Sequence, residues 1–361
     1  MNEKHGFQQL PAPMAIATQR WPKDTLPVVS VCCITFNHER FIRDCLDGIL
    51  AQRTTFPVEI VVHDDASNDG TKEIVQRYAA EYPQLFRLIL QSENQWSQGI
   101  KPRTFVFPAA RGQYIAICDG DDCWIVEEKL QEQVEALELH TECDISFHPA
   151  VKNIAGDQSE TICNHSYEIR IIPPQDVIRG GGGFMPTSSI MIRSDAMTRV
   201  MHFFDATPNA PIGDIPIQVI GSSPGGALFL PMVACTYRFK ALGSWTERIE
   251  RDETLLNTWF VNVFMMYDCL NRFLDYGYGS AIKEKIQFYY GLEQLLDARF
   301  FLSNKRYIIK RFHSYFSRTH RLLWSIATMS PISFQLVCSG IRWSRKYGVI
   351  HRTLLSCRWR S

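Results

Sequence analysis

The C-terminal part of this 361-residue chain lacks acidic side chains. No Asp or Glu occurs between Phe300 and Ser361, a segment that carries twelve Lys and Arg. Residues 1–299 therefore hold 26 of the 38 basic residues and all 38 acidic ones, which gives this part a net charge of −12. The basic C-terminal part balances it, so the net charge of the whole chain is zero. Such an asymmetry predicts a basic tail that meets an anionic surface. The hydrophobic content of 45% is typical of a globular protein.

Patterns for a disulfide framework, a zinc site and a secretion signal are also missing. The eleven cysteines are odd in number, and Cys118 and Cys123 have no second Cys or His pair nearby. Met1–Arg20 contains no long apolar core, so we expect no signal peptide. We interpret the chain as a reduced, cytoplasmic protein that is peripheral at the inner face of the cell membrane.

Apolar runs alternate with amphipathic segments over residues 27–150. Strands are expected at 28–36, 58–62, 86–90, 114–118 and 143–147, and helices at 40–52, 71–80, 104–110 and 127–140. This alternation predicts an α/β fold, with a doubly wound, mostly parallel sheet and helices on both faces. Because right-handed crossovers bring the carboxyl ends of parallel strands together, Asn37, Asp64, Asp65 and Asp119 are expected on one rim.

The regular alternation stops near residue 151. We therefore divide the chain into a poorly ordered lead-in (1–26), an α/β domain (27–245, with halves 27–150 and 151–245) and a basic, aromatic helical region (246–361). In the second half of the domain, strands are expected at 188–192, 227–230 and 232–239, and Asp214 opens a short apolar helix between two prolines.

Three carboxylates follow the expected strand Tyr114–Cys118, at Asp119, Asp121 and Asp122. Clustered acids repel one another and lose hydration at the end of a buried strand. A divalent cation removes that cost, and Mg²⁺ or Mn²⁺ prefers hard oxygen ligands and leaves positions open for substrate phosphates. The alternative is an acidic, solvated turn that caps a helix beginning near Ile125.

Three motifs in order carry a resemblance to a known family. They are Val29-Ser-Val-Cys-Cys-Ile-Thr-Phe-Asn37, Val61-Val-His-Asp-Asp-Ala-Ser-Asn-Asp-Gly-Thr71 and Gly112-Gln-Tyr-Ile-Ala-Ile-Cys-Asp-Gly-Asp-Asp-Cys-Trp124. Together they resemble the family 2 glycosyltransferases of the GT-A fold. The resemblance is strong over residues 27–150, thinner over 151–245, and does not cover the C-terminal hundred or so residues.

The resemblance implies roles for the residues on the rim. Thr35, Asn37 and Glu39 would line the base pocket, and Asp65 or Asp64 would accept a hydrogen bond from the base. Alternatively, the segment Ser67–Gly70 forms a plain turn and helix cap. In the third motif, Asp121 would be the main metal ligand, Asp119 would contact the ribose or the metal, and Asp122 would support them. The implied cofactor is Mn²⁺ or Mg²⁺.

Two later segments would complete such a site. Asp214 matches the position of the family's general base, although Gly213 stands where the family often has a second acid. A helix N-terminus would stabilise the Asp214 anion, and the alternative is that Asp214 only caps the helix. Arg238 or Lys240 would neutralise the diphosphate leaving group, or simply end a solvated strand. The loop at 180–189 would face the acceptor and move as a lid.

The C-terminal region combines helical periodicity with basic charge. Helices are expected at 255–274 and 282–301, and Leu322–Ile341 is a run of twenty uncharged residues. Pro331 and the basic groups on both flanks argue against a membrane-spanning helix and favour an amphipathic hairpin lying on anionic lipid. The alternative is a helical subdomain packed on the core, with its basic face in water.

These observations predict a metal-dependent, inverting glycosyltransferase of the hexosyltransferase type. The expected donor is a nucleotide diphosphate sugar, in the first place a UDP-sugar, and the acceptor is a saccharide or lipid-linked saccharide of surface polysaccharide biosynthesis. We expect an anionic membrane surface as a partner and no nucleic acid. The alternatives are a non-catalytic nucleotide-sugar-binding or scaffold protein and a nucleotidyltransferase of similar topology.

Overall fold

The computed structural model describes residues 9–22, 24–154, 158–239, 248–249, 251–287, 299–330, 332–337 and 339. The chain forms two compact units. Unit 1 contains Met1–Val177, Gly182–Asp205 and Gly213–Ser244. Unit 2 contains Ile178–Gly181, Ala206–Ile212 and Trp245–Ser361. The expected lead-in at 1–26 falls within unit 1, where its described part pairs with the domain through a short two-stranded sheet of β1 (Met14–Ala15) and β3 (Arg53–Thr54).

The main sheet of unit 1 has eight strands in the order β11-β13-β8-β12-β6-β2-β4-β5. Their bounds, in that order, are Arg170–Ile172, Ala227–Phe229, Ile145–Phe147, Met191–Arg193, Tyr114–Ile117, Val29–Thr35, Val58–Asp64 and Phe86–Leu90. The strands β6, β2, β4 and β5 are parallel, as are β13 and β8. The expected mostly parallel sheet is thus confirmed, with β12 running antiparallel between β6 and β8.

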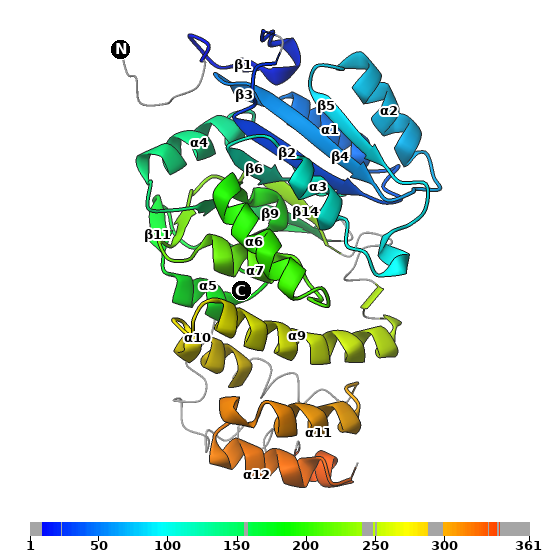
Figure 1. Ribbon diagram of the computed structural model, residues 1–361, viewed down its shortest axis with the longest axis vertical. Coiled ribbons are helices and arrows are strands. Elements are labelled where there is room, and N and C mark those ends of the chain that lie inside the picture. Colours follow the sequence, from blue (N-terminus) through cyan, green and yellow to red (C-terminus); the bar gives the residue numbers. More distant parts are fainter. Residues whose placement is uncertain are drawn as a thin grey trace. The chain divides into compact units, whose positions relative to one another are not determined.

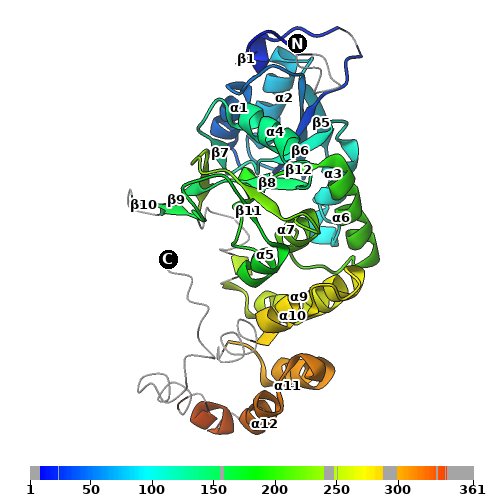
Figure 2. The ribbon, with the colours of Figure 1, turned by 90° about the vertical axis from the view of Figure 1, so that its left-hand side faces the viewer.

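Helices cover both faces of this sheet (Figure 2). On one face, Val29, Val31 and Cys33 of β2 pack in one core with α1 (Ile42–Leu50), α2 (Thr71–Glu81) and α4 (Lys129–Leu139). On the other face, α3 (Arg103–Ala109) packs against β2 and β4 and contacts α6 (Ser194–Ala206). Strand β2 is buried along almost its whole length because it has helices on both sides, which explains its nearly continuous apolar sequence.

A second, four-stranded sheet carries residues of the later part of unit 1. Its order is β10-β9-β14-β7, with bounds Gln158–Ile162, Ala150–Ile154, Cys235–Arg238 and Cys123–Trp124. The short helix α7 (Asp214–Gly221) begins at Asp214, as expected. The turn η3 (Thr187–Ser189) is a 3-10 turn, so the expected strand at 188–192 shortens to β12 (Met191–Arg193). The remaining helices are α5 (Pro174–Gly180), η1 (Ile16–Thr18) and η2 (Trp96–Gln98).

Unit 2 is helical, and Figure 1 shows its helices in yellow and orange. They are α9 (Glu253–Phe273), α10 (Gly279–Glu284), α11 (Leu302–Arg311), η5 (His313–Tyr315) and α12 (Arg318–Ala327). Aromatic contacts hold them together, since Phe260 stacks on Phe300 at 4.0 Å between ring centres and Phe264 packs against Phe312 at 5.8 Å. The expected helix at 255–274 is confirmed as α9, whereas most of the one expected at 282–301 lies outside the described residues.

The uncharged run Leu322–Ile341 does not form one helix over its described part. Helix α12 ends at Ala327, and a further helical segment begins at residue 332. Among the described residues, no helix is both long enough and apolar enough to cross a bilayer.

Candidate active site

The carboxyl ends of β2, β4 and β6 lie side by side. Thr35, the last residue of β2, pairs in register with Asp64 of β4, and its carbonyl oxygen accepts a hydrogen bond from the Asp65 N–H at 3.1 Å. From the other side, the Gly120 N–H donates to the Ile34 carbonyl at 2.9 Å. Three motifs that are far apart in sequence therefore meet at one rim, as the sequence predicts.

Gly120 sits in close contact with the end of β2. A Cβ atom there would stand 2.7 Å from Thr35 Oγ1 and 2.9 Å from His38 Nδ1, so only glycine fits without a shift. Thr35 is fully buried and its hydroxyl oxygen has no hydrogen-bond partner among the described atoms. The expected base-pocket residue Thr35 thus lies beneath the Asp119–Asp122 turn.

Asn37 and Glu39 join the first two loops of the rim. Asn37 has a positive φ of 57°, its N–H donates to Ser67 Oγ at 2.9 Å, and its Oδ1 accepts from the Asn68 N–H at 2.9 Å. Glu39 Oε2 accepts from the Gly70 N–H at 3.1 Å, at the start of α2. Both side chains therefore fix the loop that follows β4.

Asp64 and Asp65 are both buried and use their carboxylates differently. Asp64 accepts from the Ser67 hydroxyl at 2.5 Å and from the Ser67 N–H at 3.1 Å, so it braces its own turn. Asp65 accepts from the N–H groups of Gln95 and Trp96 at 2.8 and 3.1 Å. Asp65 therefore anchors η2, a segment that the sequence did not connect to the rim.

The acids Asp119, Asp121 and Asp122 gather directly after β6. Burial, together with the charges of Asp121, Asp122 and Asp214, raises the pKa of Asp119 well above its ordinary value. Burial and the charge of Asp121 raise the pKa of Asp122 to about 7. Asp122 is buried and the next helix begins only at Lys129, so the alternative of an acidic, solvated turn capping a helix near Ile125 is wrong for Asp122, whereas Asp119 is half-buried.

Asp214 reaches this cluster from a distant part of unit 1. It is the first residue of α7, the N-cap is Gly213, and that end of the helix has no side-chain cap. The Asp214 carboxylate is instead hydrogen-bonded to the Thr187 side chain, so the interpretation of Asp214 as a mere cap is wrong. Its pKa is raised by burial, while the Thr187 bond and the charge of Arg103 oppose the shift. Burial outweighs the anion stabilisation that we expected from the helix N-terminus.

The turn η3 connects Asp214 with the acids that follow β6. Ser188 Oγ donates to Asp122 Oδ2 at 2.7 Å and accepts from the Asp119 N–H at 3.4 Å. The Ser188 carbonyl accepts from Trp124 Nε1 at 2.8 Å. Ser188 is 1% exposed and its neighbour Ser189 is fully buried, so this end of the expected mobile loop at 180–189 is fixed in the core.

Arg238 lies against the acid cluster from β14. Its N–H donates to Asp122 Oδ1 at 3.2 Å and its Nη1 to the Asp121 carbonyl at 2.6 Å, while its Nη2 forms an ion pair with Asp44 at 2.6 Å. The guanidinium also stands 4.9 Å from the centre of the Phe41 ring. Arg238 thus lies beside the acids, and Lys240 lies outside the described residues.

The donor atoms at this rim suit a hard divalent cation. Asp119 and Asp121 could supply oxygen ligands, whereas both Asp122 oxygens already accept hydrogen bonds from Ser188 and Arg238. Among the described residues, no group of three His, Cys, Asp or Glu side chains is arranged to hold a metal ion. Mg²⁺ sites commonly consist of one or two carboxylates completed by water and substrate phosphates, which Asp119 and Asp121 match.

Four residues of the site escaped the sequence analysis: Thr187, Ser188, Arg103 and His38. Arg103 stands over the Phe204 ring at 3.8 Å, and burial lowers its pKa to about 10 although the charge of Asp214 opposes the shift. His38 is influenced by Asp121 and Asp69, and burial lowers its pKa. Of these four residues, only His38 could have been found from the sequence, because it directly follows Asn37 in the first motif. Thr187, Ser188 and Arg103 lie in no recognisable sequence pattern.

Solved structures share this architecture. TarS residues 1–349 from S. aureus, in complex with UDP-GlcNAc, align with a TM-score of 0.56 and 16% identity over 89% of this chain and 92% of that one. A mannosyltransferase from Pyrobaculum calidifontis, in complex with GDP-Man and Mn²⁺, aligns with a TM-score of 0.50 and 18% identity over 94% and 89%. The fold is that of the GT-A glycosyltransferases.

A family model matches part of the sequence. Residues 30–197, somewhat less than half of the chain, match the sequence model of glycosyl transferase family 2. The match covers the rim residues Asn37 to Asp122 and the turn η3, and it ends before Asp214 and Arg238.

Relatives extend the comparison beyond the family model. The uncharacterized protein Rv1520 of Mycobacterium tuberculosis is 37% identical over 218 residues, which are 60% of this chain and 60% of that protein. The putative teichuronic acid biosynthesis glycosyltransferase TuaG of Bacillus subtilis is 31% identical over 121 residues, 34% of this chain and 46% of TuaG. These matches span 60% and 46% of the two relatives, in both cases less than two thirds of their length.

Proposed function

We propose that the chain is a metal-dependent, inverting glycosyltransferase that moves one sugar from a nucleotide diphosphate sugar to a saccharide or lipid-linked saccharide. One observation carries the proposal: the turn η3 brings Asp214 to the rim where the family motifs meet, because Ser188 Oγ bonds to Asp122 Oδ2 at 2.7 Å and the neighbouring Thr187 side chain bonds to Asp214. The TarS complex with UDP-GlcNAc and the mannosyltransferase complex with GDP-Man support a nucleotide-sugar donor. Of the two nucleotides, UDP and GDP, we favour UDP as the carrier of the donor sugar.

The chain's own residues divide the work of binding the donor. The loops braced by Asn37, Glu39 and Asp64 would hold the base, and Asp119 would contact the ribose. When bound, a divalent cation at Asp121 and Asp119 would neutralise the diphosphate and act as a Lewis acid on the leaving group. Arg238 and Lys240 would add positive charge where the leaving group's charge develops.

Asp214 would act as the general base. As the acceptor oxygen forms its bond to the anomeric carbon, the bond from that carbon to the diphosphate oxygen breaks, and the acceptor's proton passes to an Asp214 oxygen. Attack opposite the departing nucleoside diphosphate inverts the anomeric centre. A base works best when its pKa approaches the working pH, and burial moves the pKa of Asp214 in that direction.

The reaction products distinguish this proposal from its rivals. The full chain is incubated with Mn²⁺ and a panel of UDP- and GDP-sugars, binding is measured by calorimetry, and released nucleotide is quantified with simple glycosides as acceptor probes. We expect release of nucleoside diphosphate from the donor that binds. Release of pyrophosphate would indicate a nucleotidyltransferase, and tight binding without any release would indicate a binding protein.

Replacing Ser188 tests the role of η3. Ser188→Ala removes a hydrogen bond to the enclosed Asp122 carboxylate, so we expect a loss of about 1–3 kcal/mol in the free energy of unfolding. Because Asp119 and Asp122 lose a shared partner, the Mn²⁺ concentration for half-maximal transfer should rise about tenfold or more. Denaturant unfolding and a Mn²⁺ titration of transfer provide the two readouts.

Ser189→Ala is the matched control, since Ser189 is equally buried but its hydroxyl donates to the Pro186 carbonyl and contacts none of the acids. It should cost stability without changing the Mn²⁺ requirement. An unchanged Mn²⁺ requirement in Ser188→Ala would show that η3 does not position the acids.

A further inference from the structure

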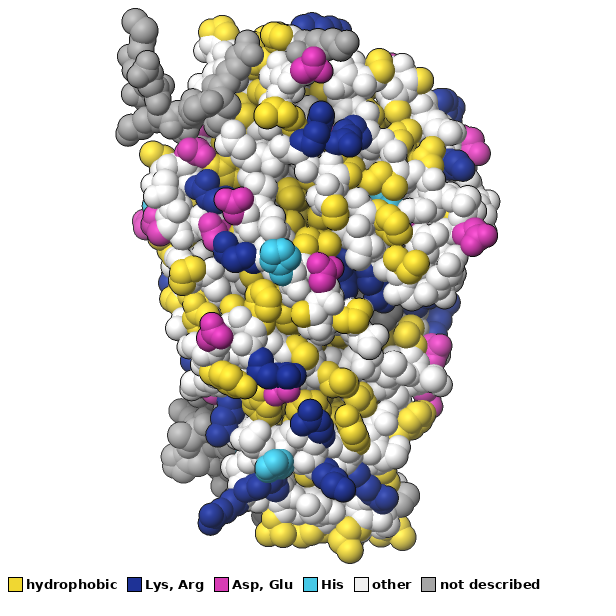
Figure 3. Space-filling view, in the orientation of Figure 1, with side chains coloured by type: hydrophobic (Ala, Val, Ile, Leu, Met, Phe, Trp, Pro, Cys, Tyr) yellow, Lys and Arg dark blue, Asp and Glu magenta, His cyan; other side chains and the backbone are white. Residues whose placement is uncertain are grey.

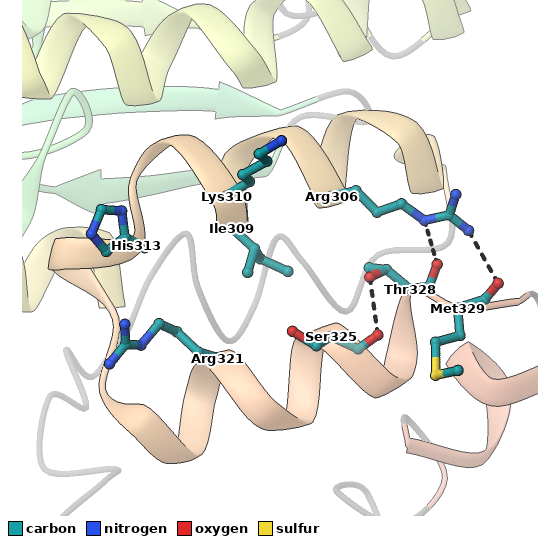
Figure 4. Close-up of a pocket in the computed structure, with 8 residues that line it drawn as sticks. All are labelled: Arg306, Ile309, Lys310, His313, Arg321, Ser325, Thr328 and Met329. Atoms are coloured by element: carbon teal, nitrogen blue, oxygen red, sulfur yellow. Dashed lines mark hydrogen bonds between the residues drawn. The ribbon is translucent and has the colours of Figure 1, made fainter.

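Helices α11 and α12 of unit 2 line an open surface cavity of about 710 Å³ (Figure 4). Arg306, Ile309 and Lys310 of α11 line it together with His313, and Arg321 and Ser325 face them from α12. Three of these side chains carry a permanent positive charge, a fourth is a histidine, and the described lining contains no acid. The cavity is therefore a cationic site with room for an anionic group.

The two ends of the cavity differ. At one end, Arg306 donates to the carbonyl oxygens of Thr328 and Met329 at 2.5 and 3.1 Å, so it holds the end of α12 in place. At the other end, Arg321 extends from α12 toward His313 (Figure 4). Arg306 thus has a structural task, and the charges of Lys310, His313 and Arg321 are those a ligand would meet.

Among the described residues, the helices that line the cavity supply no counter-charge. Residues 299–330 contain no Asp or Glu. Asp268 of α9, which packs against α11, is already paired, because it forms an ion pair with Arg272 at 3.1 Å and accepts from the Tyr315 hydroxyl at 2.9 Å. An unbalanced cluster of cations in a recess attracts anions strongly.

An exposed apolar ridge accompanies the cavity. Leu322 and Ile326 lie four residues apart on α12, and Met329 follows the end of this helix; they are 65%, 45% and 73% exposed. Ile332 and Leu336 of the next helical segment are 71% and 68% exposed. In the space-filling view, basic side chains gather over α11 and α12 next to apolar ones (Figure 3). A run of neighbouring exposed apolar side chains beside cationic ones is a feature of surfaces that contact a protein or a membrane.

We propose that α11 and α12 form a membrane-binding site for anionic phospholipid, in which Lys310, His313 and Arg321 hold the headgroup phosphate and the ridge Leu322–Ile326–Met329 enters the acyl boundary. Cations beside an apolar ridge are the arrangement by which helices lie in a bilayer interface. The inference extends the proposed lipid-linked acceptor by naming where the chain meets the membrane. Vesicle binding is measured without any transfer, so either proposal can fail alone.

The test is co-sedimentation of the full chain with vesicles. We expect binding to an equal mixture of phosphatidylglycerol and phosphatidylcholine, weakening as salt is added, and little binding to phosphatidylcholine alone. The double variant Lys310→Glu/Arg321→Glu should bind the anionic vesicles at least about 30-fold more weakly, because each basic residue near the surface contributes about 1 kcal/mol. Leu322→Ser/Met329→Ser should weaken binding about tenfold or more while keeping the salt dependence.

Arg20→Glu/Arg77→Glu is the matched control, since both arginines are exposed in unit 1 and the net charge changes equally. It should bind vesicles within about twofold of the unchanged chain. Circular dichroism and the melting temperature establish that each variant is folded, and Lys310→Gln/Arg321→Gln replaces the charge reversal if that variant unfolds.

Three outcomes would overturn the proposal. One is equal binding to neutral and anionic vesicles, and another is an equal loss in the control variant. The third is a cavity that binds inorganic phosphate or a short nucleic acid duplex while the chain ignores anionic vesicles, which would assign the site to a free anion or a nucleic acid.

Discussion

Asp121→Asn should abolish sugar transfer while the chain stays folded. The change is isosteric, and it removes the charge of the residue that we place as the main metal ligand next to Asp119 and Asp122. Without it the cation is held less tightly and the diphosphate charge is not neutralised, so we expect transfer to fall by about 1000-fold or more. Initial rates over a range of Mn²⁺ concentrations give the result, and circular dichroism checks the fold.

Asp195→Asn provides the comparison for this variant. Asp195 lies exposed in the first turn of α6, so the same chemical change there should leave transfer within about twofold. Near-normal activity of Asp121→Asn at saturating Mn²⁺ would defeat the assignment of Asp121 as a metal ligand.

Asp214→Asn should retain the donor and lose the chemical step. The amide keeps the volume of the carboxylate and can still bond to Thr187, but it cannot take the acceptor's proton. General-base catalysis is typically worth about 100- to 10,000-fold, so transfer should fall by that factor while the donor's dissociation constant stays within a few-fold. Calorimetry with the donor and single-turnover transfer separate the two effects.

Asp205→Asn is the corresponding control, because Asp205 is exposed near the end of α6. If Asp214→Asn transfers sugar within a few-fold of the unchanged chain, the base is a different residue. If it loses donor binding to the same extent as transfer, Asp214 contributes to the pocket rather than to the reaction.

The sequence predicted the parallel half of the sheet well because its strands are apolar on both faces. Val28–Phe36 and Val58–Val62 were recognised as strands, and the structure places them as β2 and β4 with helices on both sides. The later half was predicted less well, because its strands are three to five residues long and their partners are distant. The reversed strand β12 is an example: its pairing with β6 depends on register, which three residues do not encode.

The residues of the candidate site also differ in how well the sequence predicts them. Residues inside motifs, such as Asn37 and Asp121, could be found because acids and amides cluster visibly after apolar runs. Ser188 and Arg103 could not, since a serine or an arginine in a loop or helix is ordinary until folding brings it to a carboxylate. The pKa of Asp214 could not be predicted either. The sequence indicates that Asp214 begins a helix, which would lower its pKa, but it does not indicate the burial that raises it.

The direction of β12 has a consequence for how the site can change. An antiparallel strand enters the sheet at the edge where its parallel neighbours leave it, so the residues preceding β12 arrive at the acids, as the hydrogen bond from the Ile117 N–H to the Ile190 carbonyl at 3.1 Å illustrates. Sequence changes in the segment before Thr187 would therefore alter the surface next to the acids while the pairing of the strands stays the same. If the function proposed above holds, the acceptor side of the site can therefore diverge while the parallel strands of the donor side stay the same.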